Sequence, residues 1–111
     1  MKLNSALPQD KKLTVLFRVE SGCLGPTGEE HIEDFCLFAE KELKVVDANY
    51  MNWMITPRHD KSEPEIEYKV NNKNLSHDKA AKYLGIFDKN LDDVEERLHD
   101  KLSILIDQHL S

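Results

Sequence analysis

The residue best suited to chemistry in this sequence is Cys23, which lies in a glycine-containing stretch just before a predicted helix. A thiol near a helix N-terminus can be activated as a nucleophile or as a redox sensor. Such a cysteine needs a base, and His31 is the nearest histidine in sequence. No third residue that would orient His31 can be identified, so a structural role for Cys23 is favoured over a catalytic one. Cys36 lies on an apolar stripe and is predicted to belong to the core.

Three glycines, Gly22, Gly25 and Gly28, recur at every third position of the same stretch. Backbone N–H groups of glycine-containing loops that precede a helix can bind phosphate. The spacing matches neither the dinucleotide fingerprint nor a P-loop, and no lysine follows it. Thr27 and Glu30 have the spacing of a capping box, which would already occupy N–H groups of the helix start. Small-ligand binding at Gly22–Gly28 is therefore an alternative, and tight turning is the favoured role of the glycines.

Other residue types that bind metals or act as acids and bases show no informative spacing. The five histidines form neither HxxxH nor HExxH, and no CxxC is present. A metal site assembled from distant residues stays open, but the sequence itself predicts no metal and no cofactor. The acid pairs Asp92-Asp93 and Glu95-Glu96 are predicted to lie on a solvated helix face, where nothing shifts their pKa toward neutrality. Catalysis is accordingly disfavoured.

The elements that must position these residues form a single α+β domain over residues 13–111, preceded by a flexible leader at 1–12. Strict alternation predicts a strand at 13–19, and apolar residues at spacings of three and four predict an amphipathic helix after Thr27. The further elements are strands at 50–56 and 65–70, and helices from Ser76 to about 84 and from about 89 to 109. The expected order is β-α-β-β-α-α, with helices packed on a three-stranded, mostly antiparallel sheet. Residues 73–75 are an alternative fourth strand, and the strand order stays open.

The charge distribution bears on the class of partner. The chain of 111 residues has a net charge of −6. Residues 29–46 contain two Lys/Arg and six Asp/Glu, and residues 86–111 contain three and seven, so each of these helical segments has a net charge of −4. Acidic helices repel nucleic acid, and no basic cluster suggests a membrane surface. No transmembrane or signal segment is recognised, so a cytoplasmic location with reduced thiols is expected.

Surplus apolar residues indicate association. Leu16, Tyr50 and Met54 are expected on the sheet face opposite the main apolar row, which should be polar if it is wet. Ile104 lies in the last helix, in a segment that is apolar around most of its circumference. The favoured function is therefore a protein-binding or assembly module that forms a homodimer through either the sheet face or the end of the last helix. The alternatives are a thiol-dependent enzyme or redox-responsive protein that uses Cys23, and small-ligand binding at the glycine loop.

Overall fold

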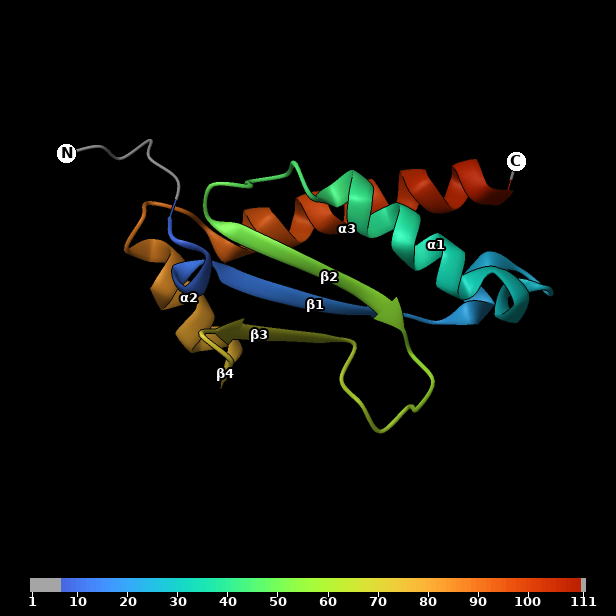
Figure 1. Cartoon of the computed structure of the whole chain (residues 1–111), viewed down its shortest axis with the longest axis horizontal. Coiled ribbons are helices and arrows are strands. Elements are labelled where there is room, and N and C mark those ends of the chain that lie inside the picture. The colour runs from blue at the N-terminus through green and yellow to red at the C-terminus, as the bar shows by residue number, and fades with distance from the viewer. Residues whose placement is uncertain (1–6, 111) are drawn as a thin grey trace.

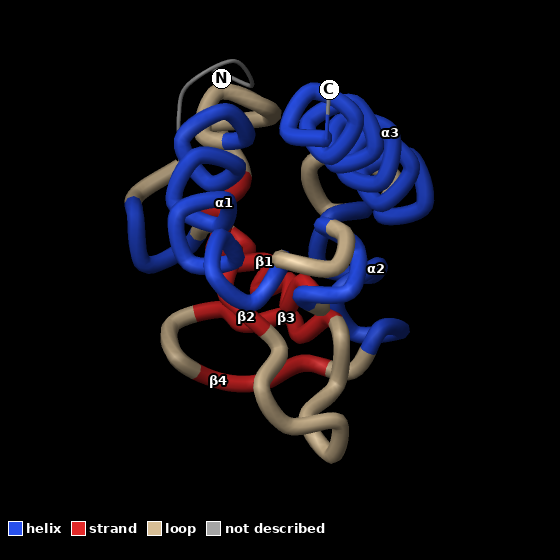
Figure 2. The backbone as a smooth tube through the Cα atoms, turned by 90° about the vertical axis from the view of Figure 1, so that its right-hand side faces the viewer, coloured by secondary structure: helices blue, strands red, loops and turns tan. Residues whose placement is uncertain are grey.

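The computed structural model describes residues 7–110, in which a four-stranded sheet carries the α-helices on one face (Figure 1, Figure 2). In chain order, the elements are β1 (Leu13–Val19), α1 (Gly28–Leu43), β2 (Met51–Pro57), β3 (Ile66–Val70), β4 (Lys73–Leu75), α2 (His77–Gly85) and α3 (Leu91–Leu110), with the short 3₁₀ helices η1 (Gln9–Lys11) and η2 (Ser21–Leu24). The α+β class and the order β-α-β-β-α-α are confirmed. Residues 73–75 do form the fourth strand.

The sheet is mixed, with the strand order β2-β1-β3-β4. β1 and β2 are parallel, and α1 is the crossover that parallel neighbours require. The two other pairings, β1 with β3 and β3 with β4, are antiparallel. Asn71 and Asn72 have φ angles of 52° and 65°, so they form the tight turn between β3 and β4. The pairing with β2 and β3 on its two sides places β1 in the middle of the molecule.

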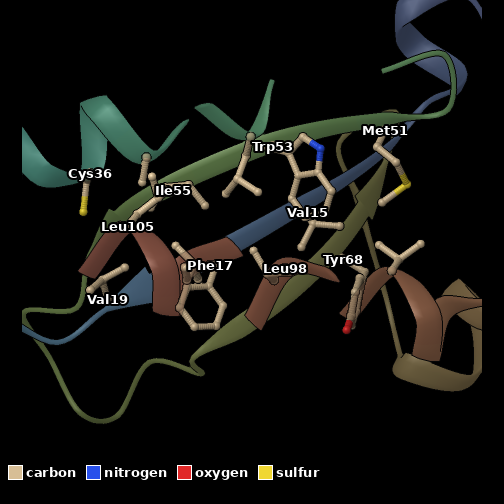
Figure 3. Packing of buried hydrophobic residues seen from close by; sticks show 14 of the residues in the cluster. Val15, Phe17, Val19, Cys36, Met51, Trp53, Ile55, Tyr68, Leu98 and Leu105 are labelled. Carbon is tan, nitrogen blue, oxygen red and sulfur yellow. The ribbon is translucent and has the colours of Figure 1, made fainter. Parts of the chain in front are cut away.

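The core lies between the sheet and the helices. β1 contributes Leu13, Val15, Phe17 and Val19, which alternate toward the helices and are each no more than 7% exposed. Figure 3 shows Val15, Phe17 and Val19 of this row, with Ile55 of β2, packed against Leu98 and Leu105 of α3. The indole N–H of Trp53 donates a 2.8 Å hydrogen bond to the carbonyl of Val46, so its polar group is satisfied.

The two long helices are amphipathic, as their spacing predicts. The buried residues of α1 are Gly28, Ile32, Phe35, Cys36, Ala39 and Leu43, and those of α3 are Leu91, Val94, Leu98, Leu102 and Leu105. The opposite faces of both helices carry the acidic residues. Within residues 7–110, no helix combines the length and the apolar character that a bilayer-spanning helix needs.

The predicted capping box at the start of α1 is wrong. Thr27 is the N-cap residue, but its φ and ψ of −103° and 18° lie outside the extended region, and its side chain caps no N–H. The N–H of Glu30 instead donates to the backbone carbonyl of Thr27 at 3.0 Å. The cap predicted for α2 is confirmed, because Ser76 is extended and its hydroxyl accepts from the N–H of Lys79.

The described part of the predicted leader, residues 7–12, contacts the domain at several points. The N–H of Leu7 donates to the carbonyl of Asn49 at 2.9 Å. The side-chain amide of Gln9 donates to Asn52 at 2.7 Å, and the hydroxyl of Tyr83 donates to the carbonyl of Lys11. These bonds fix the chain where it enters β1. Residues 1–6 of the predicted leader lie outside the described residues.

Candidate functional site

Cys23, the candidate nucleophile, is an exposed residue of η2. Its backbone N–H donates to the carbonyl of Glu20 at 3.0 Å, and within residues 7–110 no hydrogen bond joins its thiol to another side chain. The imidazole of His31 packs instead against that of His109 on α3, with ring centroids 5.7 Å apart. The thiol and its candidate base are thus not joined in a catalytic pair.

The glycines around Cys23 have distinct structural roles. Gly28 is buried at the first position of α1, and a Cβ atom there would lie 1.9 Å from the carbonyl oxygen of Ser21. Gly25 has a φ of +89°, a conformation that other residues rarely adopt. A Cβ atom on Gly22 would meet nothing within 4 Å. Close backbone packing at Gly28 and a turn at Gly25 therefore account for two of the three glycines.

We predict that Gly28→Ala destabilises the protein and that Gly22→Ala does not. The first substitution forces Ser21 away from α1 and should lower the free energy of unfolding by about 1–3 kcal/mol, the usual cost of overpacking. The matched substitution at Gly22 should stay within about 0.5 kcal/mol. Urea unfolding of both variants measures the difference, and equal stabilities would refute the close packing at Gly28.

The two cysteines should differ in reactivity. Burial, together with the nearby carboxylates of Glu40 and Glu33, raises the pKa of Cys36 to about 12. We predict that a thiol reagent at neutral pH labels Cys23 in the native protein and reaches Cys36 only after unfolding. Mass spectrometry of labelled peptides distinguishes the sites. A Cys23 rate far above that of glutathione would favour the thiol-enzyme hypothesis, whereas a comparable rate would remove its chemical support.

A pocket of about 330 Å³ lies where the parallel strands β1 and β2 end. It is lined by Val19, Ser21, Glu29, Ile32, Pro57, Arg58 and His59. The guanidinium of Arg58 is held by the Glu20 carboxylate at 2.7 Å and by the carbonyls of Lys61 and Glu63, each at 3.1 Å. Ligands of sheets with parallel strands commonly bind outside the carboxyl ends of those strands.

A second surface is the sheet face that carries no helix, here called the open face. Figure 2 shows the helices on the other side of the sheet. Leu16 of β1 lies opposite Met54 of β2 in the register, so their side chains are neighbours on this face. Leu16 is only 7% exposed, whereas Met54 is 49% exposed. Met54 is therefore an apolar group in contact with water on the β2 edge of the open face.

Charged residues lie beside Leu16 on the side away from Met54. Leu16 also lies opposite Glu67 of β3, whose carboxylate is 2.6 Å from the guanidinium of Arg18. Arg18 further contacts the carboxylate of Glu63 at 3.6 Å and donates to the carbonyl of Pro64 at 2.7 Å. The Arg18 side chain is only 12% exposed, so it is fixed by these partners rather than free in solvent.

A further cavity borders the open face along the free edge of β2. It has a volume of about 630 Å³. Its lining comprises Gln9, Lys12, Thr14, Glu40, Lys41, Lys44, Ala48, Met51, Asn52, Trp53 and Met54. The Glu40 carboxylate accepts the N–H of Ile55 at 2.9 Å, and the carbonyl of Asp47 accepts that of Met51 at 3.0 Å. These two donors of β2 are thus already paired within the chain.

The other two predicted interface residues lie elsewhere. Tyr50 precedes β2 and packs against the core, with its ring 6.0 Å from that of Phe87 and 4.8 Å from the ammonium of Lys89. Ile104 is 53% exposed on α3, on the helical side of the molecule. Of the three residues predicted to share the sheet face, Leu16 and Met54 are neighbours there and Tyr50 is not, whereas Ile104 belongs to the separately predicted surface on the last helix.

A polar cluster that has no counterpart in the sequence motifs lies where β3, α2 and α3 meet. The Tyr68 hydroxyl donates to the carboxylate of Glu95, and the Nε2 atom of His77 is 3.4 Å from both oxygens of that carboxylate. Burial raises the pKa of Glu95 above its usual range, and the nearby His99 partly offsets this rise. The sequence separation between Tyr68 and Glu95 explains why a motif search misses this cluster.

Comparisons of the chain with protein-family models, with curated proteins and with solved structures found no match. The surfaces described above are therefore interpreted from their own geometry and chemistry.

Proposed function

We propose that this protein is an assembly module whose open face binds a second copy of the chain. The observation that carries the proposal is the 49% exposure of Met54, next to Leu16, on a sheet face that the helices do not cover. Burying a methionine gains free energy from removing apolar area from water, and its flexible side chain adapts to the surface that it meets. The hollow beside Met54 gives room for side chains of the second copy.

The charge distribution favours contact through the open face over contact through the helices. Residues 29–46 and 86–111 each have a net charge of −4, so two helical layers would repel each other. The open face instead carries both signs, with Arg18 beside Glu63 and Glu67. A two-fold contact places a patch against the same patch of the second copy. Positive groups can then face negative groups only if the patch carries both signs.

The paired N–H groups at the edge of β2 favour a dimer contact through the open face over one in which a strand is added to the edge of the sheet. An added strand would need the free N–H groups of the β2 edge, as in other edge-to-edge contacts. Two of those groups, from Met51 and Ile55, are already bonded to Asp47 and Glu40. At the other edge of the sheet, β4 has only three residues. Both edges thus offer little to a pairing strand, whereas the open face stays accessible.

Replacing Met54 by glutamate should weaken the dimer at least about tenfold, because association would then bury an unpaired charge in the contact. Ile104→Glu is the matched control, since it makes the same chemical change at a site of similar exposure on α3. Sedimentation equilibrium across the micromolar range measures the dissociation constants of wild type and both variants.

Two results would refute this proposal. A wild-type protein that is monomeric over the whole concentration range rules out the homodimer. A dimer that Ile104→Glu weakens while Met54→Glu leaves it intact places the contact on α3. Circular dichroism of both variants confirms that each is folded before its association is compared.

Small-ligand binding at the pocket between Ser21 and His59 is a second candidate function, favoured by its position at the carboxyl ends of β1 and β2. Its lining includes the carboxylate of Glu29, whereas the one guanidinium there is held by Glu20. A small amine is therefore the class of ligand that fits.

We predict that amines from a fragment library shift the amide NMR signals of Ser21 and His59. Glu29→Ala should weaken this binding about tenfold, the value of one charged hydrogen bond. Glu30→Ala is the control, because Glu30 is the adjacent acid of α1 and does not line the pocket. Amines that cause no shifts at the pocket, or that bind Glu29→Ala equally well, would remove this candidate.

A further inference from the structure

We propose that His77, Asp92 and Glu95 form a binding site for a divalent cation, for which Zn²⁺ is the best fit. One ligand atom from each of these residues lies within 4.8 Å of the others. Ligand atoms bound to zinc at its usual distances are about 3.3–3.5 Å apart in a tetrahedral arrangement. The imidazole nitrogen of His77 is already 3.4 Å from the Glu95 oxygens, so only a small closure of Asp92 is needed.

The backbone holds the three ligands in place. Asp92 and Glu95 are three residues apart on α3, so their side chains share one face of the helix. Leu91 and Val94, which directly precede Asp92 and Glu95 in sequence, are each 2% exposed and anchor this turn in the core. His77 is the first residue of α2, and its position is fixed by the hydrogen bond that caps the helix at Ser76.

Tyr68 supports the site from the core side. It is a buried residue of β3, and its hydroxyl donates to the Glu95 carboxylate. Its ring also packs edge-on against the imidazole of His77, with centroids 5.9 Å apart. Hydrogen bonds of this kind from residues behind the ligands fix ligand orientation in metal sites. One buried tyrosine therefore orients two of the three ligands.

The donor set determines which cation fits. One imidazole nitrogen with two carboxylates suits zinc, whereas calcium and magnesium prefer oxygen ligands throughout. The positive ends of α2 and α3 oppose a cation, but each is worth only about half a charge, against a full charge on each of the two carboxylates. Three protein ligands leave a fourth position open, and a cavity of about 310 Å³ adjoins His77 and Tyr68.

The alternative is that His77 and Glu95 form an ordinary surface ion pair, and a titration with zinc distinguishes the two. Isothermal calorimetry on protein without a histidine tag should show one Zn²⁺ per chain with micromolar affinity, and no binding of Mg²⁺ at the same concentrations. His77→Ala and Asp92→Asn should each weaken zinc binding at least about tenfold, and Tyr68→Phe about tenfold, as for residues behind metal ligands.

His109→Ala is the control, because His109 and His31 are the one pair of histidines whose rings are in contact within residues 7–110. Zinc binding that this variant abolishes would place the ion at that pair and overturn the proposal. The absence of zinc binding at submillimolar concentrations, or binding that His77→Ala leaves unchanged, would also overturn it. His77 and Asp92 are exposed, so both ligand variants should fold, and NMR signals of the His77 imidazole provide a direct second readout.

Discussion

The apolar row of β1, formed by Leu13, Val15, Phe17 and Val19, has to be removed from water, and this requirement determines where the helices lie. The crossover helix α1 covers the part of the sheet formed by β1 and β2. Helix α3 lies beside α1 on the same face of the sheet and completes the cover of the row (Figure 1, Figure 2). Burying the side chains of such a row contributes about 1.5–3 kcal/mol each. A single helical layer is enough for this, and within residues 7–110 no helix lies on the second face of the sheet (Figure 2).

The open face is consequently the part of the fold whose composition needs explanation. A central strand with one wet face should alternate between apolar and polar residues. β1 departs from this at Leu16, which is apolar yet only 7% exposed, because neighbouring side chains shield it. The Arg18 and Glu67 pair beside it satisfies charge within the face. On the adjacent strand β2, Met54 is 49% exposed on the same face, and the proposed dimer contact rests on this residue.

The sequence predicts those parts of the fold that depend on local periodicity. The alternation of Leu13–Val19 gives β1 with its observed bounds, and the turn at Asn71 and Asn72 gives the β3–β4 hairpin. The parallel pairing of β1 with β2 depends on how α1 packs, which no local pattern determines. The capping box fails for a related reason. The close approach of Gly28 to Ser21 accompanies a non-extended Thr27, whose hydroxyl then caps no N–H.

The surfaces that motif searches miss are assembled by the sheet from distant residues. Met54 is exposed because the face it shares with Leu16 lacks a helix, and the cluster around Glu95 exists because β3 passes beside α2 and α3.

β3 connects the two surfaces through adjacent residues. Glu67 points to the open face and pairs with Arg18, whereas Tyr68 points to the core and bonds to Glu95. The strand is paired on both sides, with β1 and with β4, which restrains its backbone. Coupling between two sites requires an element with two arrangements, and a doubly paired strand favours one. We therefore expect no coupling through β3 between the proposed dimer contact and the proposed cation site, although this strand positions residues of both.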